Sequence, residues 1–152
     1  GKGREGSFGG ETMNTRAMIA VGDALDGLKW AESIGGLSAL IKRSNANLAA
    51  LEAWVENSDW CAFLAEDPAV RSNTSVCLKV KDEKFNAMDA KNQATALKLM
   101  VTLLNDEGVA YDIGAYRDAP AGLRIWAGAT VETSDLEALL PWLDWAYGQV
   151  KP

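Results

Sequence analysis

The sequence contains no histidine, and this absence is the strongest restriction that its composition places on function. Without histidine, the chain lacks the usual general base near neutral pH and the commonest protein ligand of transition metals. Only two cysteines are present, Cys61 and Cys77, and they form neither a CxxC pair nor a secreted-type disulfide framework. We therefore expect no metal site, and two reduced cysteines in a cytoplasmic protein.

The chain also lacks long apolar runs and an excess of basic residues. No run approaches the ~20 residues that a transmembrane helix needs, and the N-terminus is rich in glycine and charge rather than signal-like. The 15 basic residues are outnumbered by 21 acidic ones, which argues against nucleic acid as a partner. With 152 residues, 48% of them hydrophobic, the chain can bury one core without disulfides or metal ions. We expect a soluble protein that does not contact membranes.

Apolar residues recur at helical spacing in three segments, residues 15–33, 37–55 and 89–105. Glycines that follow the first and third segments are natural helix ends. In the second segment, Arg43 and Asn47 fall on the polar face, opposite the apolar stripe. Ser134 and Glu137 form a capping-box pattern before a last helix, which Pro141 should kink or restart.

Alternation with a period of two predicts strands between these helices. In residues 74–80, Val76, Leu78 and Val80 alternate with more polar residues. Residues 109–113 and 123–131 are two further short strand candidates. The resulting order suits an α/β (α+β) fold, a two-layer sandwich with helices packed on a mostly antiparallel sheet.

Four residues are candidates for binding anions. Asn14 and Thr15 stand at the expected start of the first helix, where free backbone N–H groups and the helix dipole favour an anion or an ordinary helix cap. Arg124, next to Trp126 in a strand candidate, is either a solvated edge residue or a planar fork that faces an anion. Arg117 lies on the preceding turn, as a surface residue or as a second guanidinium at the same end of the sheet.

Three tracts resemble phosphoserine aminotransferases of some bacteria and archaea: GETMNT (residues 10–15), SNTSVCLKV (residues 72–80) and YRDAPAGLRIWAGATVETSDLEALLPWLDWAY (residues 116–147). The resemblance covers essentially the whole chain in order. It implies the C-terminal small domain of a fold type I, class V aminotransferase that depends on pyridoxal 5'-phosphate. Residues 1–14 would be an arm or linker from a large domain that is missing here, and residues 15–152 would form the small domain.

The resemblance also implies a role for each candidate residue. Asn14 and Thr15 would contact the phosphate of the pyridoxal 5'-phosphate held by the other subunit of a homodimer. Arg124 would bind the α-carboxylate of the substrate, and Arg117 would help to bind the substrate phosphate. Tyr116 departs from the pattern, because some members have a histidine there that faces the phosphate.

The implied reaction converts phosphoserine and 2-oxoglutarate to 3-phosphohydroxypyruvate and glutamate, a step in serine biosynthesis. The lysine that binds the cofactor belongs to the family's large domain, so we expect no catalytic residue in this chain, no retention of the cofactor by the chain alone and no turnover. Arg16 stands where the family usually has proline. Two alternatives remain open: a free-standing binding or interaction domain derived from the small domain, and a related class V aminotransferase with another small amino acid as substrate.

Overall fold

The computed structural model describes residues 18–152, so Asn14 and Thr15 lie outside the described residues. The chain divides into two compact units, residues 1–39 and 40–152. In the first unit, α2 (Met18–Ser33) confirms the described part of the predicted first helix, and none of its side chains is buried. The helix ends before Gly35 and Gly36, which both adopt positive φ angles.

An antiparallel sheet of three strands forms the centre of residues 40–152. β1 (Cys61–Phe63) pairs with β2 (Ser75–Val80), and β2 pairs with β3 (Gly122–Trp126), so that β2 lies in the middle. Every second residue of β2 is buried, as the alternation in the sequence predicts: Val76, Leu78 and Val80. β1 was not predicted, because three residues are too few to show a period of two.

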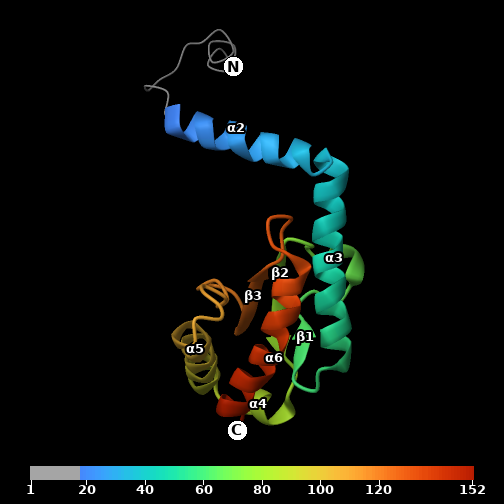
Figure 1. The fold of residues 1–152 in the computed structure, drawn as a ribbon. Coiled ribbons are helices and arrows are strands. Elements are labelled where there is room, and N and C mark those ends of the chain that lie inside the picture. Colours follow the sequence, from blue (N-terminus) through green and yellow to red (C-terminus); the bar gives the residue numbers. More distant parts are fainter. Residues whose placement is uncertain (1–17) are drawn as a thin grey trace, which may run out of the picture. The chain divides into compact units, whose positions relative to one another are not determined.

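Helices cover the apolar face of this sheet (Figure 1). They are the part of α3 (Gly36–Asn57) from Leu40 onward, α5 (Ala90–Asp106) and α6 (Thr133–Val150), with the short α4 (Glu83–Asn86) and the 3₁₀ turn η1 (Pro68–Val70) in the connections. One core cluster joins α3, α5 and α6 to the buried side of the strands. The expected two-layer sandwich on an antiparallel sheet is therefore confirmed. The opposite face of the sheet carries half-buried or exposed side chains: Cys77, Lys79, Arg124 and Trp126.

The third predicted helix is confirmed as α5, and Asp89 caps it by accepting a hydrogen bond from the backbone N–H of Asn92 (2.9 Å). The capping-box prediction for the last helix is corrected. Glu132 rather than Ser134 stands at the N-cap of α6 and makes no side-chain capping bond, so the capping box does not form. α6 also runs through Pro141 without restarting.

The two late strand predictions are only partly correct. Residues 109–113 do not form a strand, since Asp112 adopts φ +54° and breaks the extended conformation. An isolated bridge between Gly114, which follows this segment, and Leu123 links this part of the chain to β3. The predicted strand 123–131 ends earlier, at Trp126, because Val131 N–H bonds back to the carbonyl of Gly128 (3.0 Å) in a turn.

None of the helices in residues 18–152 is both long and apolar enough to cross a bilayer. Gly122, at the start of β3, lies close to the backbone of β2. A Cβ atom at this position would lie 2.1 Å from the carbonyl oxygen of Leu78, an atom of the backbone that has little freedom to move. The pairing of β3 with β2 therefore requires glycine here.

Replacement of this glycine should weaken the sheet. We expect Gly122→Ala to lower the free energy of unfolding by roughly 1–3 kcal/mol or more, because the added methyl group must push β3 away from β2. Gly148→Ala is the matched control, since a Cβ atom at this position of α6 meets nothing within 4 Å. The control should be neutral or stabilise the helix by up to about 1 kcal/mol. Equal urea midpoints for the two variants would contradict this account of Gly122.

Candidate anion-binding site

Arg124 lies at the middle of β3, on the face of the sheet away from the core. Its backbone is held on both sides: it is in register with Cys77 of β2, and its N–H donates to the carbonyl of Ile113 (2.8 Å). The side chain is only 16% exposed. The position of this guanidinium is therefore set by a paired strand rather than by a loop.

Two neighbouring residues contact the guanidinium of Arg124. Its Cζ atom lies 4.4 Å from the centroid of the Tyr116 ring, which covers its planar face. Its Nη2 donates to Asp112, at 3.2 Å to Oδ2 and 3.4 Å to the backbone carbonyl. Its Nε is buried and has no hydrogen-bond partner. The edge formed by Nε and Nη2 can bind a carboxylate through two parallel bonds, and only half of that edge is satisfied.

A cavity of about 320 Å³ adjoins Arg124. Besides apolar side chains, it is lined by Trp126 and Tyr111 and by two carboxylates, Asp112 and Asp135. Asp112 forms an ion pair with Arg124, and its own side chain is 92% exposed. The positive charge of Arg124 is thus balanced within the chain by a carboxylate that solvent can reach.

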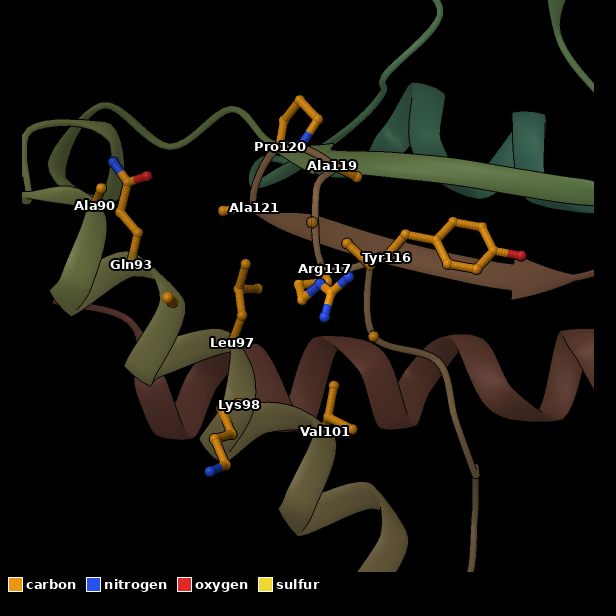
Figure 2. Close-up of a pocket in the computed structure, with 14 residues that line it drawn as sticks. Ala90, Gln93, Leu97, Lys98, Val101, Tyr116, Arg117, Ala119, Pro120 and Ala121 are labelled. Carbon is orange, nitrogen blue, oxygen red and sulfur yellow. The ribbon is translucent and has the colours of Figure 1, made fainter.

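Arg117 belongs to a different cavity, of about 550 Å³, between α5 and residues 114–122. Figure 2 shows Leu97, Lys98 and Val101 of α5 on one side of it and the loop with Tyr116, Arg117 and Pro120 on the other. The walls are mostly apolar, with Lys98 and Arg117 as the cationic side chains. Arg117 is 93% exposed and makes one long contact, 3.8 Å to Asp118. Its guanidinium is free to turn toward a ligand.

The two predicted arginines therefore line different cavities, and Tyr116 links them. The Tyr116 side chain lines the cavity of Arg117, while its ring covers the guanidinium of Arg124. Neither Asp112 nor this contact of Tyr116 was predicted, because the sequence shows no pattern that pairs either residue with Arg124.

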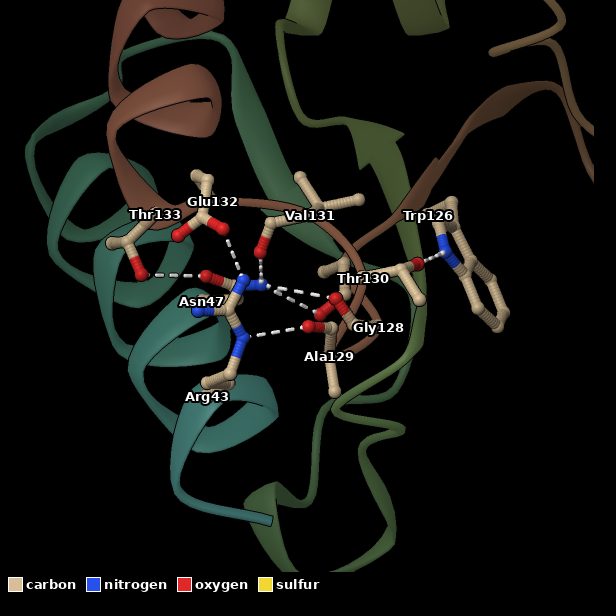
Figure 3. A network of polar contacts seen from close by, with 10 residues as sticks. Arg43, Asn47, Trp126, Gly128, Ala129, Thr130, Val131, Glu132 and Thr133 are labelled. Carbon is tan, nitrogen blue, oxygen red and sulfur yellow. Dashed lines mark hydrogen bonds and ion pairs between the residues drawn. The ribbon is translucent and has the colours of Figure 1, made fainter. Parts of the chain in front are cut away.

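The turn that leads from β3 to α6 is held by a polar network with α3 (Figure 3). Asn47, which is fully buried, donates from Nδ2 to the carbonyls of Ala127 (3.0 Å), Gly128 (3.2 Å) and Val131 (3.0 Å). Its Oδ1 accepts a hydrogen bond from the hydroxyl of Thr133 (2.6 Å). One amide thus satisfies three backbone carbonyls of the turn.

Arg43, one helical turn before Asn47, extends the same network. Its Nε donates to the carbonyl of Ala129 (2.7 Å), and its Nη2 pairs with the carboxylate of Glu132. The hydrogen bond from Arg43 lowers the pKa of the Glu132 carboxyl. The prediction that Asn47 lies on the polar face was wrong. Its helical spacing from the buried Leu51 and Val55 was the available signal.

The described residues provide little for covalent or metal chemistry. Burial raises the pKa of Cys61 to about 12, so this thiol stays protonated near neutral pH and is a poor nucleophile. From Met18 onward, no group of three or more histidine, cysteine, aspartate or glutamate side chains is placed to hold a metal ion. The arrangement can bind and orient an anion, and its chemistry rests on two guanidinium groups.

The fold is that of an α/β domain that is found within larger aminotransferases. Phosphoserine aminotransferase from Bacillus circulans subsp. alkalophilus superposes with a TM-score of 0.72 over 90% of this chain and 34% of that one, at 18% identity. A phosphoserine aminotransferase solved to study radiation damage of its Schiff base superposes with a TM-score of 0.71 at 16% identity. At these identities the likeness shows a shared fold.

Sequence relatives narrow the class further. The phosphoserine aminotransferases of Methanosarcina mazei and Methanosarcina barkeri are each 52% identical to this chain over 153 residues, which is 99% of the chain and 38% of each relative. A putative phosphoserine aminotransferase of a Mycobacterium species is 29% identical over 142 residues. No family model matches the chain. The chain is therefore a homologue of one part of phosphoserine aminotransferases, and it spans 38% of the length of these first relatives.

Loss of the Asn47 amide should destabilise the chain strongly. Asn47→Ala leaves the carbonyls of Ala127 and Val131 and the hydroxyl of Thr133 without a partner, so we expect the free energy of unfolding to fall by roughly 2–4 kcal/mol. Asn45→Ala is the control, because Asn45 is exposed on the same helix and accepts only one hydrogen bond, from Asn73 (2.8 Å). We expect a loss below about 0.5 kcal/mol for the control. Urea unfolding followed by tryptophan fluorescence measures both, and similar losses would refute the role of the network.

Proposed function

We propose that the protein to which this chain belongs is a phosphoserine aminotransferase, which converts phosphoserine and 2-oxoglutarate to 3-phosphohydroxypyruvate and glutamate. The single observation that carries the proposal is 52% identity, over 99% of the chain, with proteins of that name. The shared fold, with a TM-score of 0.72, agrees with it. In this proposal residues 15–152 form the C-terminal small domain, and residues 1–14 lead into it from a large domain.

Arg124 is the proposed ligand of the substrate α-carboxylate. Its strand position, its low exposure of 16% and its unpartnered Nε support this role, because a carboxylate would satisfy the Nε–Nη2 edge with two charge-assisted bonds. Every substrate of the proposed reaction carries an α-carboxylate. A guanidinium that is fixed by a paired strand can hold each of them in the same orientation.

Arg117 is the proposed ligand of the substrate phosphate. Its exposure and its place at a cavity that also contains Lys98 support this assignment, since both cations can approach a dianion there. By the family resemblance, Tyr116 stands where some members would have a histidine that faces the phosphate. Its ring lies on Arg124, which supports a role in holding the carboxylate ligand rather than the phosphate.

Asn14 and Thr15 are the proposed contacts to the phosphate of pyridoxal 5'-phosphate in the other subunit of a homodimer. An amide N–H and a hydroxyl are donors suited to phosphate oxygens. The cofactor, when bound, supplies the electron sink for amino-group transfer. The lysine that would hold it comes from the large domain in this proposal, so the present chain alone would not turn over. Two free cysteines agree with a cytoplasmic location.

The role of Arg124 predicts a loss shared by all substrates. In the full-length protein, Arg124→Ala should lower kcat/KM for phosphoserine and for glutamate alike, by about 10- to 150-fold, because each loses a charge-assisted bond worth roughly 1.5–3 kcal/mol. Lys42→Ala, an exposed change on α3 away from both cavities, should leave both values unchanged. A loss confined to one substrate would contradict this role.

The role of Arg117 predicts a loss of selectivity instead. Arg117→Ala should reduce the preference for phosphoserine over serine by about 10- to 150-fold, because only phosphoserine carries the dianion that pairs with this guanidinium. Steady-state kinetics with the two amino acids in the full-length protein measure the ratio. If the ratio stays the same, Arg117 is a surface residue and the phosphate is bound elsewhere.

A further inference from the structure

We propose that Asp112 is a specificity-determining residue: its carboxylate competes with the substrate α-carboxylate for the guanidinium edge of Arg124. The inference rests on the proposed role of Arg124 and adds a competing group to that site. Both hydrogen bonds that the guanidinium donates go to Asp112, to its Oδ2 and to its backbone carbonyl. Asp112 thus stands where one oxygen of a bound carboxylate would lie.

Asp112 is an incomplete substitute for a free carboxylate. Both of its contacts are to Nη2, at 3.2 and 3.4 Å, and Nε is left buried without a partner. A free carboxylate is not tied to the backbone, so it can align both oxygens with Nε and Nη2. The better partner can therefore displace the weaker one, provided that the Asp112 side chain has somewhere to go.

The Asp112 side chain has an open route away from the guanidinium. It is 92% exposed, so its carboxylate can turn into water with little change in its own solvation, while the incoming carboxylate takes its place as counter-ion of the largely buried guanidinium. Its backbone, at φ +54°, is in the left-handed region, which aspartate and asparagine tolerate better than most residues. Tyr116 meanwhile covers the face of the guanidinium and keeps its plane in place.

The charges in the cavity make this competition matter for selectivity. The cavity of Arg124 contains two carboxylates, Asp112 and Asp135, against one guanidinium. An incoming anion must therefore displace an internal negative charge as well as bind a positive one. A ligand with only one carboxylate gains little from the exchange, whereas a substrate with a second anionic group held elsewhere can offset the cost. Asp112 would thus disfavour simple carboxylates at Arg124.

The test measures carboxylate binding without turnover. The ¹⁵N-labelled 152-residue chain is titrated separately with 2-oxoglutarate, which has two carboxylates, and with pyruvate, which has one, and the Nε–Hε resonance of Arg124, assigned with Arg124→Lys, is followed by NMR. Asp112→Asn should bind pyruvate about two- to fivefold more tightly than the unsubstituted chain and should gain less for 2-oxoglutarate, since the competing charge is gone while asparagine suits the same backbone conformation. Asp135→Asn is the matched control, because it removes a charge from the same cavity while the hydrogen bonds of the Arg124 guanidinium go to Asp112, and its effect should be smaller.

Three results would overturn the inference: unchanged or weaker binding in Asp112→Asn, an equal gain in Asp135→Asn, or no saturable shift of the Arg124 resonance in any variant. The proposed function fails in a different way. Tighter binding in Asp112→Asn, in a protein that does not use phosphoserine, would keep the competition at Arg124 and remove the proposed substrate. Unchanged binding in Asp112→Asn, in a full-length protein that does use phosphoserine, would contradict the competition at Arg124 and leave the proposed function standing.

Discussion

The amide of Asn47 joins α3 to the turn after β3, and the arrangement of the sheet's outer face depends on this contact. Without the amide, the carbonyls of Ala127 and Val131 would lose their donor, so the amide favours one conformation of the turn. That turn sets both where β3 ends and where α6 begins. β3 carries Arg124, so this contact on the helical side of the sheet holds the end of the strand whose pairing with β2 positions a candidate binding residue.

The guanidinium of Arg124 has an internal counter-ion, yet part of its hydrogen-bonding edge has no partner. A half-buried guanidinium with no counter-ion would be costly. Asp112 supplies one at the rim, where the pair is exposed and therefore weak, and Tyr116 covers the face of the group. The edge that can recognise a carboxylate remains incompletely used.

The two arginines differ in burial and in freedom of movement, and these differences match their proposed ligands, a carboxylate and a phosphate. Arg124 lies on a strand, is mostly buried and has a fixed plane, which suits a planar carboxylate that must be oriented. Arg117 lies on an exposed loop beside a cavity with a second cation, which suits a bulky dianion whose position varies between substrates. Since the chain spans 38% of its first relatives, the remaining contacts of such a site would come from other parts of the protein.

The sequence by itself determined the helices and the central strand, because long segments reveal their period without help from distant residues. Residues 89–105 were predicted where α5 spans Ala90–Asp106, and residues 74–80 where β2 spans Ser75–Val80. The relation to phosphoserine aminotransferases was also readable, since ordered motifs survive at 52% identity. Both the periodic patterns and the family motifs are carried by residues that are close together in the sequence.

Only the tertiary structure decided how polar groups are paired. Asn47 lies 80 residues or more from the carbonyls that it binds, so the helical pattern could not show that it is buried. Asp112 reaches Arg124 across 12 residues and through a left-handed backbone conformation that interrupts an expected strand. The three residues of β1 form a strand only because β2 pairs with them. In each case the deciding free energy comes from a partner far along the chain, which local sequence does not specify.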